Sequence, residues 1–133
     1  MSERTTQLKN RMKQARESLE EAKDLLVQDA AVNFVMNSLY YAFLYAVFGL
    51  LELKGMHSTA QSEAISLFEH AYVQTGDIEP RFLEAIRAAF EIRPVCHCEG
   101  RKPATAEDVE QLLPLADEFL NIVERTPGMN AES

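Results

Sequence analysis

The feature that most constrains the fold is an almost unbroken apolar run, Phe34–Leu51. A stretch of this length could cross a bilayer as a helix. It contains Asn37, a serine and three tyrosines, however, and Glu52 follows directly. The segments on either side offer matching apolar faces, so the run can be covered by protein. We therefore predict a buried central helix over residues 31–54, ended by Gly55, and expect no membrane contact.

Four further segments show the 3.6-residue periodicity of amphipathic helices. They cover residues 5–29, 59–75, 80–93 and 105–123. The apolar stripe of the first comprises Leu8, Met12, Ala15, Leu19, Ala22 and Leu26. A chain of 133 residues is long enough for one real core. We therefore predict an all-α fold, a bundle of about five helices over residues 1–126, with a disordered tail over residues 127–133.

Two predicted helix starts carry the pattern of a capping box, in which a hydroxyl and a side chain three residues later satisfy free backbone N–H groups. One is Ser58 with Gln61, and the other is Thr105 with Asp108. Pro114 falls inside the last predicted helix. Because proline lacks an N–H and crowds the preceding turn, it should kink or divide that helix.

The net charge of −8 disfavours non-specific binding to a phosphate backbone. Two local clusters of cations could nevertheless hold an anion. They comprise Arg4, Lys9, Arg11, Lys13 and Arg16 in the first, and Arg81, Arg87, Arg93, Arg101 and Lys102 in the second. The simplest interpretation of the first cluster is a solvated helix face, and the alternative is a docking surface for RNA or an acidic partner.

The two cysteines, Cys96 and Cys98, are one residue apart, which strains an intrachain disulfide. Thiols in a chain without a secretory signal pattern fit a reducing cytoplasm. Together with His97 they could contact a metal, but zinc sites usually have two or more residues between paired cysteines, and four ligands in all. We therefore expect a cytoplasmic protein without a metal or another cofactor.

Three stretches of the sequence carry a resemblance to a known family. The first is Asn-Ser-Leu-Tyr-Tyr-Ala-Phe-Leu-Tyr-Ala over residues 37–46, and the second is Phe68 followed by Ala-Tyr-Val-Gln-Thr-Gly-Asp-Ile over residues 71–78. The third is Arg93 at the close of a helix, before a short loop and a final helix. In this order and spacing, over roughly residues 8–124, the chain resembles HEPN-domain proteins of the small prokaryotic branch often encoded beside a minimal nucleotidyltransferase.

The resemblance implies an antiparallel helical bundle that forms a homodimer, binds a nucleotide or RNA, and works with a nucleotidyltransferase partner in a toxin–antitoxin-like pair. Some members are metal-independent ribonucleases in which four to six residues separate an Arg from a His. Here Arg93 and His97 have three residues between them. His97 and Cys98 stand where this branch would carry an Asp-Tyr pair, and Gln61 stands where it often has a His. We therefore expect a binding subunit that is not an enzyme by itself.

The alternative is a metal-independent endoribonuclease toxin that uses Arg93 and His97. Histidine titrates near neutrality and can move the protons of RNA cleavage, and an arginine can stabilise the charged transition state. Residues four apart share one face of a helix, but Pro94 disfavours a helical conformation at Arg93. If there is no catalysis, Arg93 would cap helix carbonyls or pair with a carboxylate, and His97 would be exposed.

Ligand contacts are expected from Asn37, Tyr40, Tyr41, Arg87 and Arg93. A tyrosine can stack on a base, although it is more often a core residue whose hydroxyl has one partner. Adjacent helical residues point about 100° apart, so Tyr40 and Tyr41 cannot both face one site. A third interpretation is a structural interaction module without any ligand, which docks a partner helix.

Overall fold

The computed structural model describes residues 3–58, 60–92 and 104–125. These residues form five α-helices, one π-helical segment and no strand, which confirms the predicted all-α bundle. The elements are α1 (Glu3–Val27), α2 (Val32–Leu53), α3 (Gln61–Phe68), the π-helical segment η1 (Glu69–Val73), α4 (Pro80–Ile92) and α5 (Ala106–Glu124). The predicted tail over residues 127–133 lies outside the described residues, as does the segment 93–103.

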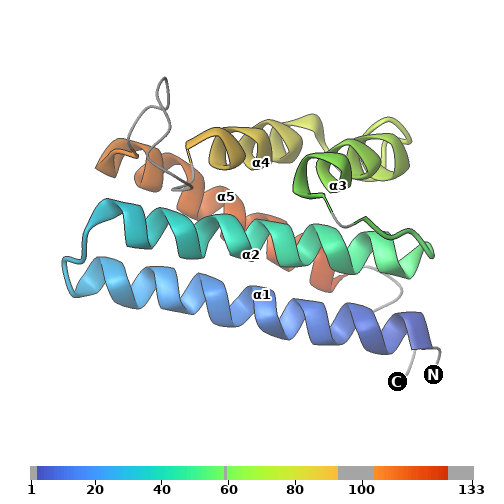
Figure 1. Ribbon diagram of the computed structural model, residues 1–133, viewed down its shortest axis with the longest axis horizontal. Coiled ribbons are helices and arrows are strands. Elements are labelled where there is room, and N and C mark those ends of the chain that lie inside the picture. Colours follow the sequence, from blue (N-terminus) through green and yellow to red (C-terminus); the bar gives the residue numbers. More distant parts are fainter. Residues whose placement is uncertain (1–2, 59, 93–103, 126–133) are drawn as a thin grey trace.

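The central helix is α2, as predicted from its apolar run. Figure 1 shows α1 and α2 side by side in opposite directions, with α3 and α4 on the other side of α2 and α5 behind it. The helix is long and apolar enough to cross a membrane, but 72% of its most apolar window is buried inside the bundle. It ends as predicted at Gly55, whose φ of +76° suits glycine. The following Met56 N–H donates to the Leu51 carbonyl at 2.8 Å and closes the cap.

The core is centred on the aromatic ring of Phe119 from α5. Its ring centroid lies 6.0, 5.7 and 5.6 Å from those of Phe43, Phe68 and Phe82, which come from α2, α3 and α4. All four side chains are fully buried. One aromatic cluster therefore joins four of the five helices.

The packing of α1 on α2 is closest at Gly49. A Cβ atom at this position would lie 2.9 Å from Leu8 Cδ1 and 3.0 Å from Arg11 Cβ, so any side chain here would push the two helices apart.

Arg16 joins α1 to α5 through Asp117 and Glu124, at 2.9 and 2.7 Å. Hydrogen bonds to Glu124 are the main reason why the pKa of the Arg16 guanidinium is raised. Two cations of the first basic cluster, Arg11 and Arg16, are therefore paired with carboxylates rather than simply solvated.

A hydrogen bond fixes the π-helical segment to α2. The Tyr72 hydroxyl donates to the Leu50 carbonyl at 2.5 Å, and Lys54 Nζ lies 4.2 Å from the centre of the Tyr72 ring. Burial, and to a smaller degree Asp77, raises the pKa of Tyr72 to about 12. The hydroxyl therefore keeps its proton, and this bond, throughout the neutral range.

The structure corrects two residues of the predicted core. Leu26 is 48% exposed and Phe34 is 65% exposed. Leu26 lies in the last turn of α1, where the periodicity continues past the last position that the bundle buries. Phe34 lies at the start of α2, on the same outer face of the helix as the exposed Asn37 and the half-buried Tyr41.

The helix starts are confirmed in one case and wrong in the other. Thr105 and Asp108 form the predicted capping box, with bonds of 2.9 and 3.1 Å. At α3 the N-cap is Ala60, and the Ser58 hydroxyl instead bonds Glu63 at 2.7 Å, because the helix begins only at Gln61.

Pro114 does not divide α5, which is a single helix from Ala106 to Glu124. The proline ring is exposed, and so is Glu110, whose carbonyl would have received the missing N–H bond. Water can satisfy that carbonyl, which explains why the helix tolerates the proline.

Candidate functional site

The first candidate site lies where α4 ends and α5 begins. The two helix ends border a pocket of about 400 Å³. It is lined by Ala88, Glu91, Ile92, Thr105, Asp108, Gln111 and Leu112. Arg93 follows Ile92 directly in the sequence, so its backbone begins within one residue of this lining. Arg93 and His97 themselves lie outside the described residues.

The electrostatics of this pocket depend on its two carboxylates, Glu91 and Asp108. The start of a helix attracts anions because its first N–H groups are free. At α5 the Asp108 carboxylate already accepts from the Thr105 N–H at 2.9 Å, so part of that potential is used by the protein itself. None of the described lining residues is a cation. A phosphate bound here would need cations from residues 93–103, where Arg93, Arg101 and Lys102 occur.

Tyr40 lies beneath the last turn of α4. Its side chain is 1% exposed, and its hydroxyl donates to Gln61 Oε1 at 2.6 Å. The Tyr40 ring centroid is 6.1 Å from that of Phe90, three residues before Arg93. The position at which the related branch often has a histidine is thus occupied by an amide that bonds a buried tyrosine. Tyr40 and Gln61 therefore help to place the end of α4 and, with it, the start of the segment that carries Arg93.

Four of the five predicted ligand contacts, Asn37, Tyr40, Tyr41 and Arg87, lie in the described residues, and their side chains face different surroundings. Asn37 is exposed and Tyr41 is half-buried on the outer face of α2, whereas Tyr40 points into the bundle. The rings of the two tyrosines meet edge-on, with centroids 5.4 Å apart. Arg87 is exposed on α4 and pairs with Glu69 at 2.7 Å. Sequence reasoning did not include Gln61 or Phe90 among the site residues, because no local pattern marks contacts between helices.

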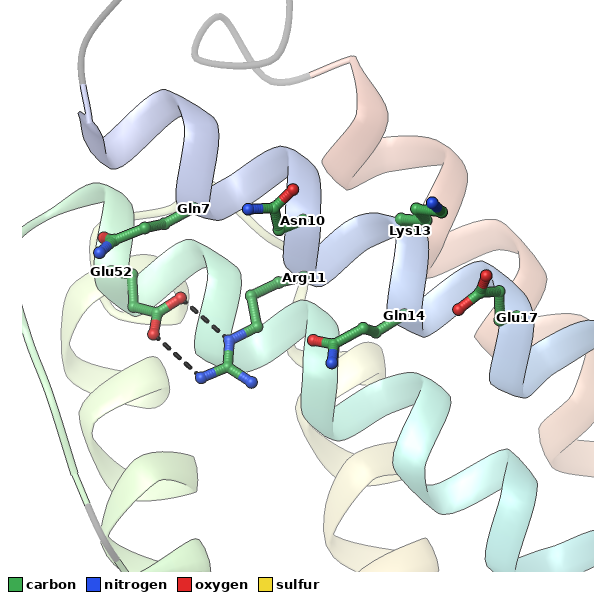
Figure 2. Close-up of a pocket in the computed structure, with 7 residues that line it drawn as sticks. All are labelled: Gln7, Asn10, Arg11, Lys13, Gln14, Glu17 and Glu52. Atoms are coloured by element: carbon green, nitrogen blue, oxygen red, sulfur yellow. Dashed lines mark hydrogen bonds and ion pairs between the residues drawn. The ribbon is translucent and has the colours of Figure 1, made fainter.

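A second pocket of about 570 Å³ lies along residues 7–17 of α1, which supplies every lining residue except Glu52 of α2 (Figure 2). It is open and polar. Its lining consists of Gln7, Asn10, Arg11, Lys13, Gln14, Glu17 and Glu52. Arg11 holds the Glu52 carboxylate through two bonds of 3.1 Å each, and its guanidinium lies 5.3 Å from the centre of the Phe48 ring.

Within the described ranges, no group of three or more His, Cys, Asp or Glu side chains could hold a metal ion. The three residues that could contact a metal in the sequence, Cys96, His97 and Cys98, lie outside those ranges. The described part of the site can therefore contribute packing, hydrogen bonds and carboxylates.

Comparison with known proteins gives two findings. The HEPN domain matches residues 8–126 of the chain, which include every described helix apart from the first residues of α1. A curated protein of Thermotoga maritima, described as a UPF0332 protein, is 28% identical over 113 residues, and the aligned part covers 85% of each chain. The match includes both helices that border the α4–α5 pocket and the segment between them.

Proposed function

Because the chain belongs to the HEPN domain family, we propose that it is a binding subunit rather than an enzyme by itself. Two copies of the bundle pair with each other and with a nucleotidyltransferase-type partner in a toxin–antitoxin-like system. A nucleotide or RNA binds at the end where α4 leads into Arg93. The family match is the observation that carries this proposal.

The α4–α5 pocket supports this place for the ligand. It adjoins a short segment that carries Arg93, Arg101 and Lys102 on a chain whose net charge is −8. Cations held in one place can attract phosphate even when the whole protein is acidic. Arginine suits this role because its planar guanidinium binds phosphate through two parallel hydrogen bonds.

Two sequence features favour binding over cleavage. Arg93 and His97 are separated by three residues, one fewer than in the ribonuclease motif, and Pro94 lies between them. Where the related branch often has a titratable histidine, this chain has Gln61, and the amide oxygen of Gln61 already accepts a hydrogen bond from the Tyr40 hydroxyl. A general acid or base must give or take a proton near neutral pH, which an amide cannot do.

Incubation with RNA in EDTA tests the proposal against its closest alternative. We expect a fluorescent single-stranded RNA, or ATP as the nucleotide probe, to bind the wild-type protein, and we expect the RNA to stay intact. The His97→Ala variant, purified in parallel, controls for contaminating ribonuclease. RNA cleavage by the wild type that His97→Ala abolishes would instead establish the endoribonuclease. The absence of binding to either probe would favour a structural module without a ligand.

A further inference from the structure

One stripe along α2 is only partly covered by the other described helices. Between Val35 and Leu51 every residue is buried except four. Together with one residue before them and one after them on the same face, these four residues form what we call the α2 stripe. It comprises Phe34, Asn37, Tyr41, Tyr45, Phe48 and Glu52. Steps of three and four residues keep a stripe on one face of a helix. The central helix of the bundle therefore carries a row of four aromatic side chains on its outer face, of which Phe34 is exposed and Tyr41, Tyr45 and Phe48 are half-buried.

The contacts of the α2 stripe are incomplete within one copy of the chain. Phe34 is 65% exposed. The rings of Tyr41 and Tyr45 pack on each other with centroids 5.9 Å apart, but in the described part of the chain neither hydroxyl has a hydrogen-bond partner. Exposed rows of aromatic residues mark interaction surfaces, and tyrosine is enriched where such surfaces bind most strongly.

The two ends of the α2 stripe carry different groups. Phe34 projects at one end, and the open pocket beside Arg11 and Glu52 lies at the other (Figure 2). The ends are 18 residues apart, which is about 27 Å along the helix. The midpoint falls between Tyr41 and Tyr45. A two-fold axis there would place Phe34 of each copy over the pocket of the other, where the Arg11 guanidinium can contact its ring.

The charges on the adjacent helix α1 fit the same arrangement. Its first half carries Arg4, Lys9, Arg11 and Lys13 beside a single carboxylate, Glu3. Its second half carries Glu17, Glu20, Glu21 and Asp24 beside two cations, Arg16 and Lys23, so it remains acidic in balance. When two such helices lie antiparallel, the basic half of each faces the acidic half of the other. The same carboxylates would repel RNA from this face, so the charge pattern favours a second copy of the chain over a nucleic acid.

We propose that the α2 stripe is the two-fold interface between two copies of this chain. The inference rests on the self-pairing in the proposed function and adds the face, the axis and the residues. It assigns Asn37 and Tyr41 to the interface instead of the ligand. None of the residues that line the α4–α5 pocket belongs to the stripe, so that pocket stays available to a ligand in the dimer.

Cysteine cross-linking between differently tagged chains tests this face. Cys96→Ser and Cys98→Ser are introduced first to remove the native thiols. Chains carrying Tyr41→Cys are then mixed with chains carrying Tyr45→Cys and oxidised with copper phenanthroline. Since the axis places position 41 of one copy next to position 45 of the other, we expect a disulfide-linked pair of the two tags on a non-reducing gel. The matched control is Ser62→Cys mixed with Ser66→Cys, two exposed positions four residues apart on α3.

Light scattering on the wild-type chain separates the possible failures. A dimeric wild type whose 41/45 pair cross-links no more than the 62/66 pair would overturn the α2 stripe as the interface, while self-pairing would stand. A monomeric wild type would overturn both. With the stripe as the interface, Phe34→Ala is also expected to raise the dimer dissociation constant at least about tenfold, because a buried aromatic anchor is lost. Circular dichroism checks that this variant keeps its helices.

Discussion

Replacing Phe119 with alanine is expected to lower the free energy of unfolding by about 3–5 kcal/mol. The side chain is fully buried, and its ring lies within 6.0 Å of three other phenylalanine rings. Removal of the ring loses its transfer free energy and leaves a cavity, because rings held by three different helices cannot close in on the gap. Domains are stable by only about 5–15 kcal/mol, so this one change removes a large share of the total.

Urea unfolding followed by circular dichroism measures this effect. The control is Val27→Ala, at a side chain that is 87% exposed, for which the change should stay within about 0.5 kcal/mol. Phe119→Leu should cost less than Phe119→Ala, since it fills most of the same space. A loss below about 1 kcal/mol for Phe119→Ala would show that the aromatic cluster does not hold the helices together.

The second large effect is expected at Arg93. Arg93→Ala should weaken the binding of single-stranded RNA or ATP by about 10- to 100-fold, because charge-assisted hydrogen bonds to phosphate contribute about 1.5–3 kcal/mol. Fluorescence anisotropy at fixed salt measures both affinities. The control is Arg125→Ala, which removes the same charge from an exposed residue at the far end of α5 (Figure 1). Equal losses in the two variants would mean that Arg93 acts only through the net charge.

The sequence was sufficient for the parts of the fold that depend on local patterns. The Phe34–Leu51 run predicts a buried helix because few other environments can hold so many apolar side chains. Gly55 ends that helix through its positive φ, and Thr105 with Asp108 starts α5, because both signals act within a few residues. Each of these features is fixed by chemistry within about one turn of helix.

Features that depend on where helices meet could not be predicted in this way. The periodicity places Leu26 on the same stripe as buried residues. A periodic pattern does not show where along the helix the covering helices end, however, so it could not predict that Leu26 is exposed. The hydrogen bond between Tyr40 and Gln61 joins positions 21 residues apart, and Arg16 reaches α5 across more than 100 residues. Such pairs depend on the relative placement of helices, which one sequence does not encode in any local pattern.

The sequence names candidate site residues but not their geometry. The family pattern singles out Arg93, and the structure adds a pocket bordered by α4, whose last residue, Ile92, directly precedes Arg93 in the sequence. Helix geometry predicts that Tyr40 and Tyr41 point apart, but only the packing shows that Tyr40 faces the bundle and Tyr41 the outer face of α2. The partly exposed row on α2 could not be seen in the sequence, because its aromatic residues are as apolar as the buried residues around them.

The most direct test of the proposal that this chain is a binding subunit is to capture it with its predicted partner. The chain is co-expressed with a tagged nucleotidyltransferase encoded beside it, captured through the tag, and passed through size-exclusion chromatography with light scattering. We predict one stable complex whose mass requires two copies of this chain, and no capture by an unrelated tagged protein. A strictly monomeric chain that elutes alone, or the absence of any such neighbour, would contradict it.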